Sequence, residues 1–322
     1  MPVVTYQSET IDATPDAPLL DTLLDAGHRI PHSCRSGVCH SCMMICQEGT
    51  PPQAAQNGLK PAQKRQNMFL ACSCLPTEDM TVVLPDQSQI TSEATITDIT
   101  WLAKQVYRLK VRADMDFIAG QYVTLWRDGE TGRSYSIANP PNDDKEIEFH
   151  IKHIPDGAFS DWAHKLTVGD TLRIQGPMGE CCYGVDDVEC PLVFIGTGTG
   201  LAPLYGIIQD AIAHEHQGEM HAFIGAYNTD TLYYINELKA LSSKHPQLQL
   251  HFSVLKPSDD QPDGVQTLAL DQLVLDQPLP LKQSHIYLCG APDIIEKLRK
   301  QLFLNGASFQ RIHADVFVHS AP

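Results

Sequence analysis

A chain of 322 residues is longer than one hydrophobic core usually supports, and its 43% hydrophobic and 19% charged residues are typical of an ordinary globular protein. A formal net charge of −16, spread along the chain, disfavours nucleic acid as a partner, and no apolar run is long enough to span a membrane. We therefore expect two or three domains and no membrane association. Because MPVVTYQSETIDATPD lacks the features of an export signal, we expect a cytoplasmic protein, in which ten cysteines are unlikely to form a disulfide framework.

The first cysteine group lies in PHSCRSGVCHSCMMIC, residues 31–46. Cys34, Cys39 and Cys42 follow a C-x4-C-x2-C spacing, and Cys72 comes after 29 intervening residues. This is the spacing of plant-type [2Fe–2S] ferredoxins. Gly37 allows the loop to pass close to a cluster, and backbone amides there would stabilise its added negative charge on reduction. The pattern predicts a [2Fe–2S] site with these four cysteines as ligands.

The same thiols could serve other purposes. A structural zinc site prefers pairs two to four residues apart, and the single residue between Cys72 and Cys74 fits that poorly. Cys74 could in principle replace Cys72 as the fourth ligand. We expect Cys46 to be a spectator. We interpret His40 as a surface neighbour of the cluster, because Rieske chemistry needs two histidines.

The segments around these cysteines also indicate a ferredoxin. APLLDTLLDAG, residues 17–27, places four leucines on one face of a predicted helix that stops at Gly27, and the β-rich runs VVTYQ and MTVVL flank the region. These features resemble the β-grasp fold of plant-type ferredoxins, and PHSCRSGVCHSC matches their cluster loop. The resemblance implies an α+β ferredoxin domain over residues 1–88.

After a polar stretch at 85–95, interpreted as a linker, the chain alternates apolar and polar residues in several successive runs. Such runs predict an antiparallel β-barrel, which we place at residues 93–188. Within it, RSYSIAN follows GQYVTLW and resembles the RxYS motif of the ferredoxin–NADP⁺ reductase superfamily. The resemblance implies that Arg133 pairs with a flavin diphosphate, that Tyr135 lies against the isoalloxazine ring, and that Ser136 hydrogen-bonds near flavin N5, where hydride arrives.

GAFSDWAHKL, residues 157–166, supplies Gly157 and Ser160 ahead of a predicted helix. In related reductases this segment binds the flavin pyrophosphate, although the same residues could simply cap a helix. The following VGDTLRIQGPMG also resembles the superfamily. Relatives with the ferredoxin domain first generally use FAD, so the expected flavin is FAD.

From residue 191 a buried apolar run, a glycine loop and a helix begin an alternation of strands and helices. This predicts a doubly wound parallel α/β sheet, which we place at residues 190–318. In the resembling family the loop GTGTG, followed by LAP, contacts the pyridine nucleotide. The residues implied are Gly196, Thr197, Gly198 and Gly200, with Pro203 opening the helix.

YLCGAP, residues 287–292, resembles the strand-end CG motif of the same family. It implies that Cys289 lies near the nicotinamide C4 and that Gly290 leaves room for the ring. Cys181, Cys182 and Cys190 lack such a context and are expected to be ordinary core residues. Phe317, in ADVFV, corresponds to an aromatic residue that shields the flavin until nicotinamide displaces it, although five residues follow it here.

The choice of nucleotide is predicted from residues 226–238. Many relatives carry an arginine where Tyr227 stands, and this segment contains no lysine or arginine to bind a 2′-phosphate. Asp230 would repel such a phosphate. The sequence therefore favours NADH.

The order ferredoxin, flavin and nicotinamide domain resembles the reductase components of bacterial multicomponent oxygenases, such as the benzoate dioxygenase and toluene monooxygenase reductases. It implies an NADH-dependent oxidoreductase that passes electrons through FAD and [2Fe–2S] to a separate terminal oxygenase or hydroxylase. A reductase that serves a deoxysugar dehydratase has the same layout and is an alternative. A zinc-stabilised nucleotide-binding sensor is a non-enzymatic alternative.

Overall fold

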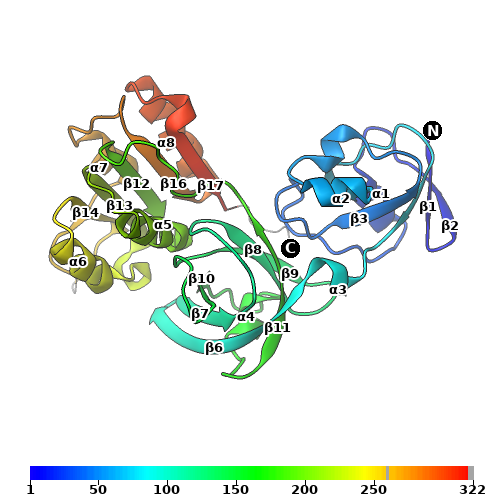
Figure 1. Cartoon of the computed structure of the whole chain (residues 1–322), viewed down its shortest axis with the longest axis horizontal. Coiled ribbons are helices and arrows are strands. Elements are labelled where there is room, and N and C mark those ends of the chain that lie inside the picture. The colour runs from blue at the N-terminus through cyan, green and yellow to red at the C-terminus, as the bar shows by residue number, and fades with distance from the viewer. Residues whose placement is uncertain (259–260, 318–322) are drawn as a thin grey trace.

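The computed structural model of the protein describes residues 1–258 and 261–317. Figure 1 shows three units, with the central β-sheet unit between an N-terminal unit and a C-terminal α/β unit. The expected fold class is confirmed: an α+β unit, an antiparallel barrel and a doubly wound parallel sheet follow one another. Residue 318, the end of the third expected domain, lies outside the described residues.

The N-terminal unit is a mixed sheet in the order β2-β1-β5-β3-β4, covered by helix α1. Three leucines of α1 are buried, whereas Leu24 is only half-buried and Thr22 is buried in its place. Thr22 can be buried because its hydroxyl accepts a hydrogen bond from the Thr14 amide (3.2 Å). The elements are β1 Val3–Tyr6, β2 Glu9–Asp12, α1 Leu19–Asp25, β3 Met43–Glu48, α2 Pro61–Arg65, β4 Met68–Leu70 and β5 Met80–Val83, with short 3₁₀ helices at Gln53–Gln56 and Ala71–Ser73.

The stretch 85–95 is more than a linker, because helix α3 (Gln87–Ile90) forms there and the first barrel strand starts at Ser92. The Asp86 carboxylate accepts a hydrogen bond from the Ser88 amide (2.8 Å) and so caps that helix. The polar composition of the stretch therefore reflects helix capping at the surface.

The central sheet is antiparallel, in the order β10-β7-β6-β11-β8-β9. Beyond the end of β9, the Ala138 amide donates to the Glu148 carbonyl on β10 (2.8 Å), which brings the two edge strands together and closes the sheet into a barrel. Alternate apolar side chains fill its interior. The elements are β6 Ser92–Ala103, β7 Val106–Arg112, β8 Tyr122–Trp126, β9 Gly132–Ser136, β10 Glu146–Lys152, α4 Ser160–Ala163 and β11 Thr171–Met178.

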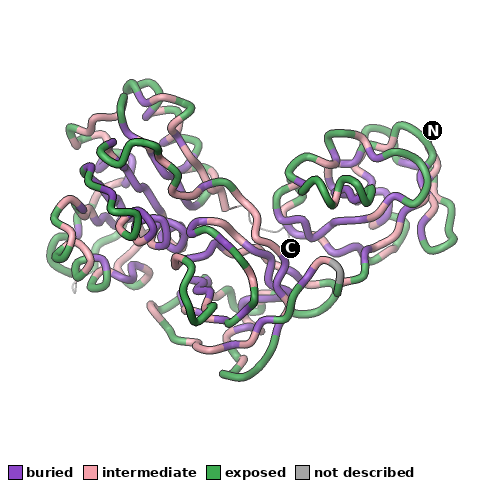
Figure 2. The backbone as a smooth tube through the Cα atoms, viewed as in Figure 1, coloured by how far each residue is buried: buried purple, intermediate pink, exposed green. Residues whose placement is uncertain are grey.

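The C-terminal sheet is parallel, in the order β15-β14-β13-β12-β16-β17. Strand order reverses between β12 and β16, and ligands of such sheets bind at the carboxyl ends of the strands at this point. Two clusters of buried side chains pack against the sheet, and its strands are mostly buried in Figure 2. The elements are β12 Leu192–Thr197, α5 Leu201–Ala213, β13 Met220–Asn228, α6 Ile235–Lys244, β14 Leu248–Lys256, β15 Val265–Thr267, α7 Leu270–Leu275, β16 His285–Gly290, α8 Pro292–Leu304 and β17 Ile312–Val316, with 3₁₀ turns at Gly198–Gly200, Thr229–Thr231 and Phe309–Arg311.

Within residues 1–258 and 261–317, none of the helices is long and apolar enough to cross a membrane.

Candidate functional site

The loop between α1 and β3 brings three cysteines together with the distant Cys72. The Ser36 and Cys39 amides donate to the Cys34 sulfur at 3.4 and 3.3 Å, and the Cys34 amide donates to the Cys39 sulfur at 3.4 Å. A hydrogen bond with the Cys39 thiol lowers the pKa of Cys34, and one with the Cys42 thiol lowers the pKa of Cys72. The same two hydrogen bonds raise the pKa of Cys39 and of Cys42. The four thiols thus form two hydrogen-bonded pairs that converge on one point, as the ligands of a metal–sulfur cluster must.

The backbone of this loop is unusual. Arg35, Gly37 and His40 all have positive φ angles, of 53°, 77° and 55°. Such turns point successive amides inward and create the anion-binding concavity typical of iron–sulfur sites. A Cβ at Gly37 would lie 2.8 Å from the Ser73 hydroxyl, so glycine is required where the two loops meet. These residues fit a [2Fe–2S] cluster.

The other potential ligands near the cluster loop, Cys74, Cys46 and His40, lie in different surroundings from the four predicted ligands. Cys74 is fully buried, and its burial raises the pKa of its thiol to about 12. Cys46 donates its thiol hydrogen to the Glu48 carbonyl (3.0 Å). His40 is buried, with only 6% of its surface exposed, so its placement at the surface was wrong. The distant turn at Gly58 faces its ring, since a Cβ there would lie 3.5 Å from His40 Nε2, and burial lowers the pKa of His40 to about 4.

A cavity of about 630 Å³ lies where the three units meet. The cluster loop contributes Cys34, Val38 and Cys39 to its wall. The barrel and the nucleotide domain contribute most of the residues implied by the resemblance to flavin reductases: Arg133, Tyr135, Ser136, Gly157, Ser160 and Phe317. Residues separated by more than two hundred positions in the sequence therefore surround one space.

Tyr135 and Ser136 lie at the end of strand β9, and Tyr135 packs against Phe159 with ring centroids 5.4 Å apart. The Ser136 hydroxyl donates to Asp315 Oδ2 at 2.7 Å. Burial raises the pKa of Asp315. The sequence analysis missed Asp315; its position at the end of the last strand, two residues before Phe317, was the available signal. A hydroxyl and a carboxyl are thus coupled inside the cavity.

The GAFS segment differs from the expected helix start. Helix α4 is a single turn, and Ser160 is its first residue, preceded by Phe159 at the cap position. The Ser160 hydroxyl instead accepts a hydrogen bond from the Ile154 amide (3.1 Å) and fixes the preceding turn. A Cβ at Gly157 would lie 2.8 Å from the Ile154 carbonyl oxygen, so this turn needs glycine. These residues shape the cavity wall through the turn rather than through a helix terminus.

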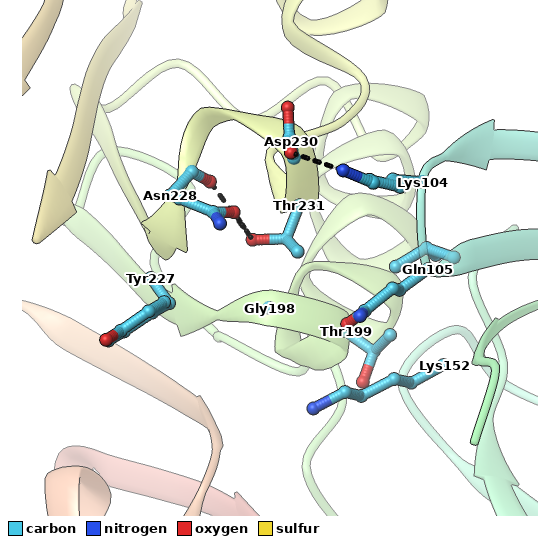
Figure 3. A pocket seen from close by; sticks show the side chains of 10 residues that line it. Lys104, Gln105, Lys152, Gly198, Thr199, Tyr227, Asn228, Asp230 and Thr231 are labelled. Atoms are coloured by element: carbon cyan, nitrogen blue, oxygen red, sulfur yellow. Dashed lines mark hydrogen bonds and ion pairs between the residues drawn. The ribbon is translucent and has the colours of Figure 1, made fainter. Parts of the chain in front are cut away.

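A second cavity of about 460 Å³ opens at the carboxyl ends of β12 and β13 (Figure 3). Its wall includes Gly198 and Thr199 of the glycine loop. Lys152 and Thr199 line both cavities, so the two spaces adjoin. Gly196 and Thr197 end strand β12, Gly198–Gly200 form the following turn, and Pro203 is the third residue of helix α5. This is the switch point at which a doubly wound sheet binds nucleotides.

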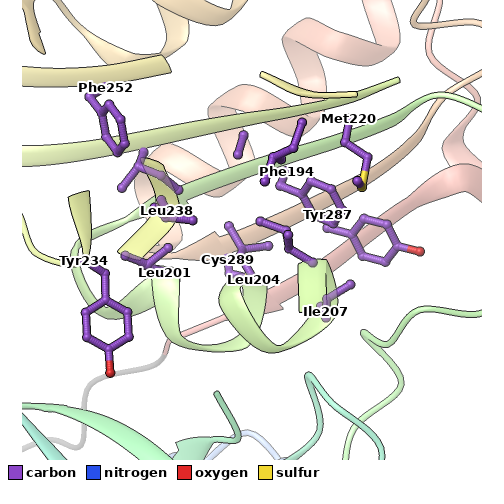
Figure 4. Close-up of a cluster of buried hydrophobic side chains, with 14 of the residues drawn as sticks. Phe194, Leu201, Leu204, Ile207, Met220, Tyr234, Leu238, Phe252, Tyr287 and Cys289 are labelled. Carbon is purple, nitrogen blue, oxygen red and sulfur yellow. The ribbon is translucent and has the colours of Figure 1, made fainter. Parts of the chain in front are cut away.

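Close backbone contacts explain the glycines of this region. A Cβ at Gly200 would collide with the Cys289 carbonyl, and a Cβ at Gly290 would collide with the Thr197 hydroxyl. Cys289 is fully buried among apolar side chains of β12 and α5 (Figure 4). Its pKa is raised by burial and by a hydrogen bond with the Cys181 thiol. Cys181 is therefore more than an isolated core residue, because it contacts the candidate site cysteine.

Two lysines from other elements approach the segment 226–238, which has none of its own. Lys104, from the turn between β6 and β7, pairs with Asp230 (3.1 Å, Figure 3), and Lys256 lies over the Tyr227 ring at 5.0 Å. Asp230 neutralises the first of these cations. The wall of the second cavity thus contains Lys104 and Lys152 besides Asp230, although residues 226–238 supply no cation.

Three family descriptions match successive parts of the chain: a 2Fe-2S iron-sulfur cluster binding domain at residues 4–77, an oxidoreductase FAD-binding domain at 92–183 and an oxidoreductase NAD-binding domain at 194–300. The expected cofactors, [2Fe–2S], FAD and NADH, agree with these domains. The chain is 30% identical over 319 residues to the ferredoxin–NAD(P)⁺ reductase component of the naphthalene 1,2-dioxygenase/salicylate 5-hydroxylase systems of Ralstonia sp, covering 96% of each.

A second relative is the CDP-6-deoxy-L-threo-D-glycero-4-hexulose-3-dehydrase reductase of Yersinia pestis, with 28% identity over 94% of this chain and 93% of the relative. Among solved structures, a cytochrome P450 reductase of Amycolatopsis matches with a TM-score of 0.68 and 27% identity over 98% of this chain and 99% of that one. Both matches span nearly the whole chain and therefore include all three domains in the same order. The chain belongs to the family of ferredoxin–NAD(P)⁺ reductase components, oxidoreductases that combine [2Fe–2S], FAD and NAD-binding domains.

Proposed function

We propose that this chain oxidises NADH and delivers the electrons one at a time, through FAD and the [2Fe–2S] cluster, to a separate terminal oxygenase or hydroxylase. The observation that carries this assignment is the cavity shared by Cys39 of the cluster loop, Ser136 of the barrel and Thr199 of the nucleotide domain. A bound flavin exchanges electrons both in pairs and singly, which is the chemistry required between a nicotinamide and an iron–sulfur cluster.

The chain's own residues bind and orient. Arg133 offers a planar guanidinium to the flavin diphosphate, and Tyr135 offers a ring face to the isoalloxazine. The Ser136–Asp315 pair presents a hydroxyl whose orientation is fixed by a buried carboxyl. Phe317 closes the cavity wall until the nicotinamide enters.

The nucleotide is held on the other side of this cavity. The glycine loop brings backbone close to it. We assign the nicotinamide ring to the strand end at Cys289 and Gly290, where glycine at position 290 lets this strand end pack closely against Thr197. Lys152 offers a cation between the two cavities. No general acid or base is required for this transfer, which depends on the placement of the two rings.

The acceptor must reach the cluster from a side that the barrel leaves open. Arg35 and Ser36 of the cluster loop are exposed, and Leu75, three residues after Cys72, has 50% of its surface exposed. We assign this face to the terminal oxygenase, by analogy with the oxygenase systems in which relatives act.

The test compares two electron acceptors. Ferricyanide takes electrons from reduced flavin, whereas cytochrome c is reduced through the cluster. The purified protein should contain iron, sulfide and flavin, and NADH should support both reactions. Cys39→Ser should remove the iron and the cytochrome c activity, while flavin and NADH–ferricyanide activity remain. Retention of cytochrome c reduction after loss of the cluster would contradict the linear route.

A dehydratase client is the second candidate, because one relative is named as a dehydrase reductase. The two differ only in the acceptor. Addition of a purified oxygenase component with its aromatic substrate should accelerate NADH consumption and give a hydroxylated product, whereas a response only to a sugar dehydratase would establish the alternative.

A further inference from the structure

Two hydroxyl groups of strand β8 reach across to the cluster loop. The Tyr122 hydroxyl donates to the Val38 carbonyl oxygen at 2.9 Å, and the Thr124 hydroxyl donates to the Cys39 carbonyl oxygen at 2.8 Å. Tyr122 and Thr124 point to the same face of the strand because they are two residues apart. One face of strand β8 therefore binds two consecutive main-chain carbonyls of the loop.

The geometry of Thr124 makes this contact specific. Thr124 is fully buried, and Ser134 Oγ lies 3.1 Å from its hydroxyl oxygen. A hydroxyl has one hydrogen, so Thr124 donates to Cys39 while it accepts from Ser134. The Thr124 hydroxyl, the Ser134 hydroxyl and the Cys39 carbonyl oxygen therefore each have a hydrogen-bond partner.

The Tyr122 ring is also held in place. A Cβ at Gly179, which has a φ of 95°, would lie 2.8 Å from the ring, so the neighbouring loop packs on Tyr122 only because it carries glycine there. Tyr122 lines the large cavity together with Cys34 and Cys39. Its ring thus lies against the flavin cavity while its hydroxyl contacts the cluster loop.

We propose that Thr124, assisted by Tyr122, is a positioning residue that holds the main chain at Val38 and Cys39 through their carbonyl groups so that the cluster faces the flavin cavity, a role that presupposes the proposed function. Electron transfer slows steeply as two cofactors move apart, so a small displacement of Cys39 would affect it strongly. Since the barrel binds carbonyl groups, the contact does not depend on the side chain at position 38.

The experiment uses holoprotein with Thr124→Val, which removes the hydroxyl at nearly constant shape, and Thr124→Ser, which keeps it. One readout is the amide hydrogen exchange of residues 33–43. The other is the ratio of cytochrome c reduction to ferricyanide reduction. Thr124→Val should speed exchange of the loop and lower the ratio about fivefold, the effect of one hydrogen bond, while Thr124→Ser stays close to the parent.

The possible outcomes distinguish a failure of the positioning role from a failure of the proposed function on which that role rests. Parental exchange and ratio in Thr124→Val, or equal losses in both variants, would overturn the role of the hydroxyl while the electron route stands. A parent protein without iron and flavin would instead overturn the proposed function, and the positioning role with it.

A separate group of side chains lies where β10 ends and helix α4 begins. His153, directly after β10, and Asp161 and His164, from α4 and the residue that follows it, place one ligand atom each within 4.8 Å of one another. His153 Nε2 lies 2.9 Å from Asp161 Oδ1. All three residues are half-buried, and Trp101 packs edge-on against both imidazoles at 5.5 and 5.8 Å.

We infer that His153, Asp161 and His164 bind a divalent transition-metal ion, such as Zn²⁺ or Ni²⁺, with two nitrogens and one oxygen as ligands. Imidazole and carboxylate groups suit these metals, and three protein ligands leave a position for water. Lys165 binds the other carboxylate oxygen, Oδ2, at 2.7 Å and leaves Oδ1 for the ion. None of these side chains lines the flavin cavity.

Calorimetric titration of the holoprotein with Ni²⁺ alone tests this site. His164→Gln and Asp161→Asn should each weaken one equivalent of binding by about tenfold or more. His313→Gln is the matched control, because His313 pairs with His285 at 3.2 Å as a two-imidazole site. Equal binding by all variants, or no binding by the parent, would overturn the assignment.

Discussion

The barrel meets its two neighbours through contacts of different chemistry. Toward the nucleotide domain, Glu148 accepts a hydrogen bond from the Tyr234 hydroxyl (2.8 Å), lies 2.9 Å from His150 and pairs with Lys110 at 3.5 Å. The His150 ring in turn lies 3.0 Å from the Tyr233 hydroxyl. Toward the ferredoxin domain, hydroxyl groups bind main-chain carbonyls, and a single exposed pair, Arg29–Glu130, adds an ion pair among the described contacts.

The chemistry of each contact determines how rigidly that neighbour is held. The nucleotide-side network buries a carboxylate, and its loss would leave other polar groups unpartnered at high cost. The ferredoxin-side bonds are neutral and individually modest. We therefore expect the flavin–nucleotide geometry to be fixed and the ferredoxin docking to be the softer of the two.

Removal of the buried carboxylate should have the largest effect. We predict that Glu148→Ala lowers the free energy of unfolding by about 3 kcal/mol, because it leaves His150 and Tyr234 without their shared acceptor. Denaturant unfolding of the holoprotein, followed by flavin release, measures this loss. Glu146→Ala is the control, since Glu146 forms a more exposed pair with the same Lys110 (3.7 Å) and should change stability by less than about 1 kcal/mol.

Equal destabilisation by these two substitutions would show that the Glu148 network is no stronger than a surface ion pair. It would contradict the expectation that the barrel holds the nucleotide domain more rigidly than the ferredoxin domain.

The Ser136–Asp315 pair crosses from the barrel to the nucleotide domain and should have an intermediate effect. We predict that Ser136→Ala slows the reduction of flavin by NADH about tenfold, because a hydroxyl oriented at the reacting ring is lost. Asp315→Asn, which keeps a hydrogen-bonding group, should slow it less. Anaerobic stopped-flow absorbance measures the rate, and flavin content is the control. An unchanged rate in Ser136→Ala would remove Ser136 from the reacting centre.

The smallest predicted effect concerns the nucleotide. The parent should prefer NADH, and Asp230→Ala should raise kcat/KM for NADPH about fivefold, because it removes a negative charge and frees Lys104. Steady-state rates with both coenzymes check this. Asp276→Ala, at a distant exposed position, should leave the coenzyme ratio as it is. A parental preference for NADPH would contradict the reading of residues 226–238.

Local patterns carried much of the fold and the candidate site. Cysteine spacing identified the cluster loop. RSYS lies at a strand end that lines the large cavity, and YLCGAP forms the end of β16, which packs against the glycine loop. Burial of the neighbouring His40 could not be read from the same loop, since distant segments cover it. Contacts between domains could not be predicted either. Nothing near Thr124 in the sequence indicates a contact with Cys39, and nothing near Ser136 indicates a contact with Asp315. Such pairs depend on how separate sheets dock.

The most direct measurement is rapid mixing of the anaerobic protein with NADH, with flavin absorbance and the electron paramagnetic resonance of the reduced cluster followed together. We expect flavin absorbance to fall first and the cluster signal to follow, and we expect protein stripped of flavin to give no cluster signal. Reduction of the cluster at the full rate without flavin would contradict this expectation.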